Sequence, residues 1–290
     1  MMMPICPNCG SYVHEGEPVC QCGTQIGDGV TVEYDDEGVS REMLERIAQN
    51  LRNEAIRLEK EGRYREAIEK CQRSLEMVYR SPTLEVIARL YHEIGDYEES
   101  LHYYNRLKTQ KDYFRAYMGI GRQLAELGRY EEAFENFDIA MEKINASSED
   151  DETKWKWISW VYTEIGWAYY LQGDYDRAIE NYEEGIGYCY DYSNNWNSKA
   201  IALKCQGKYV EALKFYDIAL SINPGDEIIL ENKEECLESY GQAYLDGEYP
   251  VESEYLDEAL NIVEEKSGFR REEHGTKESG YSILDFDEED

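Results

Sequence analysis

Four of the eight cysteines in this chain of 290 residues are concentrated near its start. Cys6 and Cys9 form a Cys-x-x-Cys pair. Cys20 and Cys22 form a tighter Cys-x-Cys pair, and a glycine directly follows each pair. Because Zn²⁺ prefers four tetrahedral ligands and accepts thiolates, the spacing predicts one structural Zn²⁺ with no open position for catalysis.

The cysteine pattern resembles a short zinc ribbon over residues 1–27, with a second pair one residue tighter than that family's usual spacing. So short a segment cannot bury a core, so metal binding would supply its folding energy. Two alternatives remain open. His14 could replace one thiolate, or Cys6 and Cys9 could act as a redox pair, although the βαβ pattern that usually accompanies such a pair is missing.

The charge of the chain is strongly negative, with 62 Asp and Glu against 30 Lys and Arg and a formal charge of −32. Direct nucleic-acid binding is disfavoured, since phosphate affinity comes mainly from Lys and Arg. A basic partner, or a salty cytoplasm, fits this charge better. The chain shows neither a secretory signal nor a long apolar run, so we expect a cytoplasmic protein with no membrane segment.

A phrase of the form Gly-x-Tyr recurs through the helical part of the sequence. It is followed three residues later by a small residue, as in "EGRYREA" and "LGRYEEA". Its glycines stand at Gly62, Gly95, Gly128, Gly173 and Gly207. Their period, close to 34 residues with one longer step, indicates stacked helical hairpins. A glycine in the left-handed conformation would end the first helix of each hairpin.

This repeat resembles the tetratricopeptide repeat family, in a prokaryotic or archaeal type that also carries the zinc ribbon. The resemblance implies an all-α, right-handed superhelical solenoid of about six hairpins over residues 41–266. In the sixth, degenerate hairpin, Gly247 and Tyr249 match the phrase and Glu252 falls at the small-residue position. The expected repeats lie near residues 48–80, 81–113, 114–147, 159–192, 193–226 and 233–266.

Three segments depart from the repeat. Residues 28–40 are typical of an acidic linker, and residues 267–290 of an acidic, disordered tail. The longer step before Gly173 adds about twelve residues, "SSEDDETKWKWI". We expect its acidic part to form a loop and its later part to lengthen the first helix of repeat four.

The family resemblance also implies a ligand groove, lined by the first helix of each hairpin. Arginines in its first half would bind carboxylates, tryptophans in its second half would accept apolar side chains, and asparagines would bind a peptide backbone. Alternatively, the arginines pair with Glu85, Glu93 and Glu126, and the insertion or the last helix covers the tryptophans. The candidate groove residues are Arg52, Arg89, Arg115, Arg122, Trp160, Thr163, Trp167, Tyr170, Asn194 and Asn197.

The function most consistent with this pattern is a non-catalytic scaffold that binds a protein or peptide. The four histidines lack metal or triad spacing, and no glycine-rich phosphate loop follows a strand pattern. A second hypothesis is that the ribbon docks on nucleic acid or on a transcription or translation assembly, although residues 1–30 contain no Lys or Arg. A third is that residues 280–290 fold back over the groove arginines as a mimic of the ligand.

Overall fold

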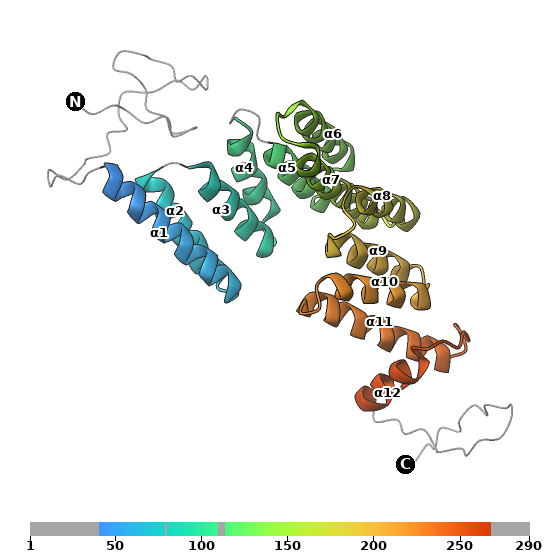
Figure 1. Cartoon of the computed structure of the whole chain (residues 1–290). Coiled ribbons are helices and arrows are strands. Elements are labelled where there is room, and N and C mark those ends of the chain that lie inside the picture. The colour runs from blue at the N-terminus through green and yellow to red at the C-terminus, as the bar shows by residue number, and fades with distance from the viewer. Residues whose placement is uncertain (1–40, 79, 110–113, 268–290) are drawn as a thin grey trace, which may run out of the picture.

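The computed structural model describes residues 41–78, 80–109 and 114–267. These ranges contain twelve α-helices and no strand, which confirms the all-α prediction. The helices follow one another as antiparallel pairs along a curved array (Figure 1). The predicted zinc ribbon, the linker and the tail beyond residue 267 lie outside the described residues.

Each pair consists of a first, odd-numbered helix and a second, even-numbered helix. The first helices are α1 (Arg41–Lys60), α3 (Ser81–Glu93), α5 (Phe114–Glu126), α7 (Asp151–Leu171), α9 (Ser193–Cys205) and α11 (Glu227–Leu245). The second helices are α2 (Tyr64–Met77), α4 (Tyr97–Lys108), α6 (Tyr130–Ala146), α8 (Tyr175–Tyr188), α10 (Tyr209–Ile222) and α12 (Leu256–Ser267). None of these helices combines the length and the hydropathy needed to cross a bilayer.

A glycine in the left-handed conformation ends every first helix, as the sequence predicts. The φ angle is 73° at Gly128 and 72° at Gly247, so the degenerate sixth hairpin bends like the others. Around Gly207, the N–H of Lys208 donates to the carbonyl of Leu203 at 3.0 Å. This bond satisfies a carbonyl at the helix end, as in a Schellman motif.

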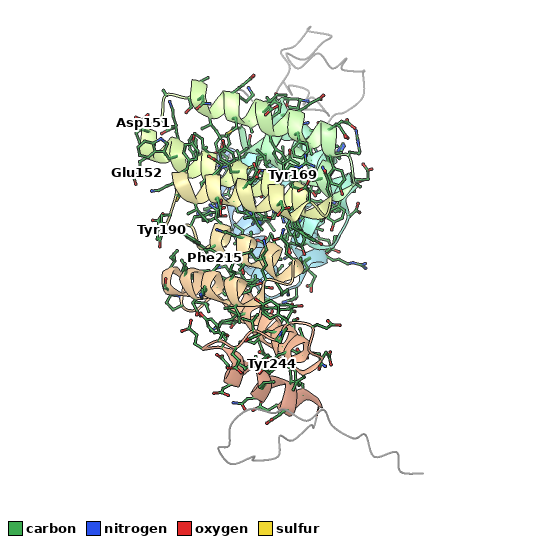
Figure 2. All side chains as sticks on the ribbon, turned by 90° about the vertical axis from the view of Figure 1, so that its right-hand side faces the viewer. Asp151, Glu152, Tyr169, Tyr190, Phe215 and Tyr244 are labelled. Atoms are coloured by element: carbon green, nitrogen blue, oxygen red, sulfur yellow. The ribbon has the colours of Figure 1, made fainter. Side chains whose placement is uncertain are left out.

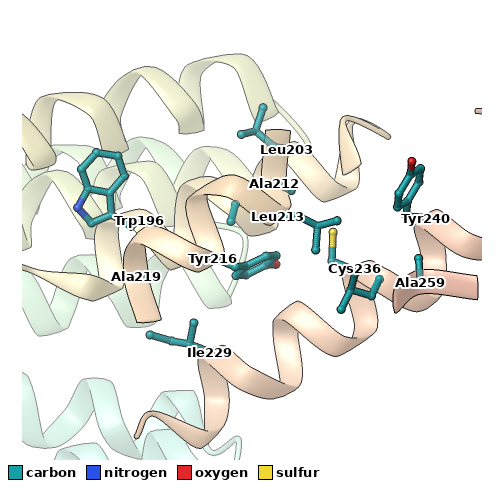
Figure 3. Close-up of a cluster of buried hydrophobic side chains, with 12 residues drawn as sticks. Trp196, Leu203, Ala212, Leu213, Tyr216, Ala219, Ile229, Cys236, Tyr240 and Ala259 are labelled. Atoms are coloured by element: carbon teal, nitrogen blue, oxygen red, sulfur yellow. The ribbon is translucent and has the colours of Figure 1, made fainter. Parts of the chain in front are cut away.

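Small and aromatic residues of the second helices pack the hairpins together. The predicted small residues Ala67, Ala133, Ala178 and Ala212 are fully buried. Such residues let two helices approach closely, and a large side chain one turn later then fills the next layer. Figure 3 shows one such cluster of buried side chains, which joins α9, α10, α11 and α12 around Tyr216.

The sixth hairpin corrects one alignment made from the sequence. Glu252 does not occupy the small-residue position, because it is exposed in the loop before α12. Ala259 takes that position instead and is fully buried. The physical reason is Pro250, which disfavours a helical conformation at Tyr249 and delays the start of the helix to Leu256.

The insertion lengthens α7, as predicted, and its acidic part is divided, with Glu149 and Asp150 in the predicted loop and Asp151 and Glu152 in the helix. Only residues 147–150 separate α6 from α7, and α7 has 21 residues against 13 in α5. The Asp150 carboxylate accepts the Thr153 N–H at 2.9 Å and caps the helix. The positive end of the helix dipole stabilises acidic side chains in the first turn. Asp151 and Glu152 are therefore favourable as the first residues of α7.

The side on which the array curves follows from the contacts between neighbouring hairpins. Among helices that are not consecutive in the chain, repeated contacts join only odd-numbered helices, namely α1 with α3, α5 with α7, α7 with α9, and α9 with α11. Neighbouring hairpins therefore approach each other more closely through their first helices than through their second helices. We call this side of the described array the inner face.

Candidate functional site

Two predicted groove arginines pair across neighbouring hairpins. Arg89 of α3 donates to both carboxylate oxygens of Glu59 in α1, at 2.6 and 2.8 Å. Hydrogen bonding to Glu59 is the main cause of the raised pKa of Arg89. Arg115 of α5 reaches Glu85 of α3 more loosely, at 3.4 Å. In each pair the two residues are 30 positions apart.

Arg122 is the most extensively bonded residue of the inner face. Its Nη1 donates to both oxygens of Glu164 in α7, at 3.0 and 3.2 Å, and its Nε lies 3.3 Å from Nε2 of His92 in α3. Its guanidinium carbon also lies 5.9 Å from the ring centre of Trp167. Attraction by Glu164 is the main cause of its raised pKa. Arg122 therefore links three successive hairpins.

The two predicted tryptophans of α7 are half-buried by polar and aromatic neighbours. The indole N–H of Trp167 donates to Glu126 at 2.8 Å, and its ring stacks on Tyr170 with centroids 5.0 Å apart. The ring of Trp160 packs at 6.3 Å against that of Tyr192. Among the described residues, these ring contacts thus involve neither the acidic loop nor the last helix.

Two more predicted groove residues, Arg52 and Thr163, form hydrogen bonds to neighbouring groups of the protein. Arg52 donates to Gln49 in the same helix at 2.9 Å. The Thr163 hydroxyl donates to the Ser159 carbonyl at 2.9 Å and lies against the amide oxygen of Asn195, a fully buried residue. Thr163 is therefore part of a packed polar network rather than a free ligand donor.

The two predicted asparagines continue the inner face toward the C-terminal hairpins. Asn194 donates to the hydroxyl of Tyr192 at 3.0 Å and is exposed. Asn197 of α9 accepts from Asn232 of α11 at 3.2 Å. Together with Trp160, which packs on Tyr192, they extend the surface from α7 to α11.

The partners of the arginines differ from those expected from the sequence. Of the three expected glutamates only Glu85 is the ion-pair partner of a groove arginine, whereas Glu59 and Glu164 were missed. The spacing of 30 residues, three less than the repeat, was the available signal for two pairs. It places an acid of one first helix opposite an arginine of the next, at Glu59 near the end of α1 and at Glu85 near the start of α3.

The described residues contain no group of three or more His, Cys, Asp or Glu that could bind a metal ion. Their four cysteines are free thiols. Burial raises the pKa of Cys71 and of Cys236 to about 12. The predicted zinc ligands Cys6, Cys9, Cys20 and Cys22 lie outside the described residues.

Three models of the tetratricopeptide repeat family match the chain. The matches cover residues 82–110, 112–188 and 163–227, which together are half of the chain. The chain belongs to the tetratricopeptide repeat family.

Solved structures and a curated relative are similar to this chain at low identity. A thermophilic tetratricopeptide protein of Thermus thermophilus has a TM-score of 0.53 and 21% identity, covering 66% of this chain and 98% of that one. Yeast Tom70 has a TM-score of 0.58 and 20% identity, covering 80% of this chain and 45% of that one. Both likenesses concern the fold alone.

Among curated proteins, the human protein O-mannosyl-transferase TMTC1 is 24% identical over 189 residues. The match covers 56% of this chain and 21% of that protein. The chain thus spans about a fifth of the length of this curated relative.

Proposed function

We propose that the chain is a non-catalytic scaffold that binds a protein or peptide along its inner face. Proteins of the tetratricopeptide repeat family generally act as interaction scaffolds. The observation that carries the proposal is the band of half-exposed arginine and tryptophan side chains across α3, α5 and α7. Arginine and tryptophan are enriched among residues that dominate binding energy at protein interfaces.

The ion pairs define what kind of ligand this band would accept. Arg89 and Arg115 remain 45% and 41% exposed although each pairs with a glutamate. A guanidinium has five N–H donors, so it can donate to a ligand carbonyl while it keeps its carboxylate partner. The ligand therefore does not need to be acidic. An extended segment would place carbonyl groups over the arginines and apolar side chains on Trp160 and Trp167.

The test is partner capture by the immobilised full-length chain from a native lysate, read by quantitative mass spectrometry. Combining Trp160→Ala with Trp167→Ala should reduce recovery of specific partners at least tenfold, since such anchors contribute about 2 kcal/mol or more. The matched control combines Leu230→Ala with Leu245→Ala, which removes exposed apolar groups of α11 on the side away from Asn232.

Circular dichroism must show the same helix content in all three proteins. Recovery of the same partners at the same level by the tryptophan variant would refute the inner face as the binding surface. Loss of the same partners in the control variant would have the same consequence.

A further inference from the structure

A second surface lies at one edge of the solenoid, where the start of α7 meets the connection between α8 and α9. It exposes three aromatic side chains, which we call the aromatic edge. Trp155 is 50% exposed, Tyr188 is 40% exposed and Tyr190 is 63% exposed. Figure 2 shows Tyr190 on the same border of the molecule as Asp151 and Glu152 at the start of α7.

The antiparallel packing of α7 and α8 brings these rings together. The Ser159 hydroxyl donates to the Gly185 carbonyl at 2.8 Å, and the rings of Tyr162 and Tyr188 stack with centroids 5.7 Å apart. Trp155 lies one turn before Ser159, on the same side of α7. The helix α8 runs antiparallel to α7 and ends about one turn after Gly185. Trp155 therefore lies beside the segment that begins at Tyr188.

The carboxylates of Glu152 and Asp191 lie at the aromatic edge, and no arginine of the described residues stacks on its rings. Lys156 pairs with Glu152 at 2.8 Å. Asp191 directly follows Tyr190, and its carboxylate accepts a hydrogen bond from the Cys189 thiol at 3.1 Å. The pKa of Lys156 is raised mainly by its hydrogen bond to Glu152 and further by Asp191. Between residues 147 and 193 the only arginine is Arg177. No cation contacts Trp155, Tyr188 or Tyr190 within the described ranges.

Elsewhere in the described residues, an aromatic ring beside a carboxylate holds a guanidinium in several cases, whereas a lysine, Lys199 or Lys233, takes that role in others. Arg177 lies 4.5 Å from the ring centre of Tyr169 and pairs with Asp174 at 2.6 Å. Arg115 lies 5.5 Å from the ring centre of Trp160 and pairs with Glu85. Arginine suits such places because its planar cation can stack on a ring and bind a carboxylate together.

The aromatic edge presents the same two components with no guanidinium between them. We propose that it binds an arginine-containing, extended segment of a basic protein partner, independently of the inner face. The formal charge of −32 would attract such a partner. The rings would then select arginine over lysine, because a flat guanidinium stacks on an aromatic face better than an ammonium does.

The probe is a fluorescein-labelled peptide of four Arg-Gly-Ser units, titrated with the full-length chain at physiological salt and followed by anisotropy. Combining Trp155→Ala with Tyr190→Ala should weaken its binding about tenfold, the effect of losing two exposed cation–π contacts. The same peptide with lysine in place of arginine should bind more weakly to the unmodified chain and show no response to these substitutions. The control that combines Leu230→Ala with Leu245→Ala should bind the arginine peptide normally.

Equal affinity of the arginine peptide for the unmodified chain and the Trp155→Ala/Tyr190→Ala variant would overturn the proposal, since binding would then reflect overall charge. Equal affinity of the arginine and lysine peptides would do the same. A tenfold gain in affinity on removal of residues 268–290, which include Arg270 and Arg271, would assign the edge to the chain's own tail instead. Self-association abolished by Trp155→Ala would assign it to a second copy.

Discussion

Gly166 has no side chain, and this allows α7 and α8 to pack closely. A Cβ built at Gly166 would lie 2.5 Å from the ring of Tyr182, which is fully buried and cannot move aside easily. We expect Gly166→Ala to lower the free energy of unfolding by about 1–3 kcal/mol through overpacking.

The matched control is Gly187→Ala in α8, where an added Cβ meets nothing within 4 Å. Alanine favours a helix over glycine, so this substitution should raise the free energy of unfolding by up to about 1 kcal/mol. Urea titration measures both. Equal effects in the two variants would show that close approach at Gly166 does not determine the stability of this pair.

The four cysteines near the start of the chain lead to a prediction about zinc content. We propose that Cys6, Cys9, Cys20 and Cys22 bind one Zn²⁺, so purified chain should contain about one equivalent. Replacing these four with serine should remove the metal, whereas Cys205→Ser should retain it because Cys205 lies in α9. Elemental analysis that finds less than half an equivalent in the unmodified chain would contradict the ribbon.

At the scale of elements, the inner-face ion pairs should couple neighbouring hairpins. The Arg122 side chain is 36% exposed and that of Glu164 only 14%, so solvent screens this pair less than a surface pair. A double-mutant cycle with Arg122→Ala and Glu164→Ala should give a coupling of about 1 kcal/mol in the free energy of unfolding.

The comparison pair is Arg129 and Glu132, which bond to each other at the start of α6. Both side chains face solvent and join no other element, so their cycle should show no measurable coupling. If the Arg122 cycle is equally small, this ion pair does not contribute to the contact between repeats three and four.

For the whole molecule, burial of thiols and phenols predicts sensitivity to alkaline pH. Burial raises the pKa of Cys71 and Cys236 from about 9 to about 12, and it raises that of Tyr182 and Tyr216 further. These groups ionise more readily in the unfolded chain. Their contribution to stability is therefore complete below about pH 9 and is lost as the pH rises toward 12.

Urea midpoints measured across this range should fall as the pH rises. In a Cys71→Ala variant the fall should be shallower, because one of the buried groups is gone. A midpoint that stays constant from about pH 9 upward would show that these thiols and phenols ionise equally well in the folded protein.

Much of the fold could be predicted from the sequence because a tetratricopeptide hairpin is specified locally. Gly128 ends a first helix, and five positions later Ala133 packs the second helix against it. This fixed distance can be recognised in the sequence. The same spacing wrongly predicted Glu252 as the small-residue position of the sixth hairpin, because Pro250 delays the start of the second helix to Leu256. Only the packed structure shows that Ala259 takes the contact position.

The sequence by itself determined the all-α class, the hairpin bends and the positions of the inner-face residues, because these depend on periods within one or two helices. The tertiary structure decided which groups these residues meet. Arg122 pairs with Glu164, 42 positions later in the chain, and not with an acid at the spacing of 30 that joins Arg89 to Glu59. How closely two neighbouring hairpins approach depends on the summed packing of many buried side chains, so no single spacing in the sequence reports this pair.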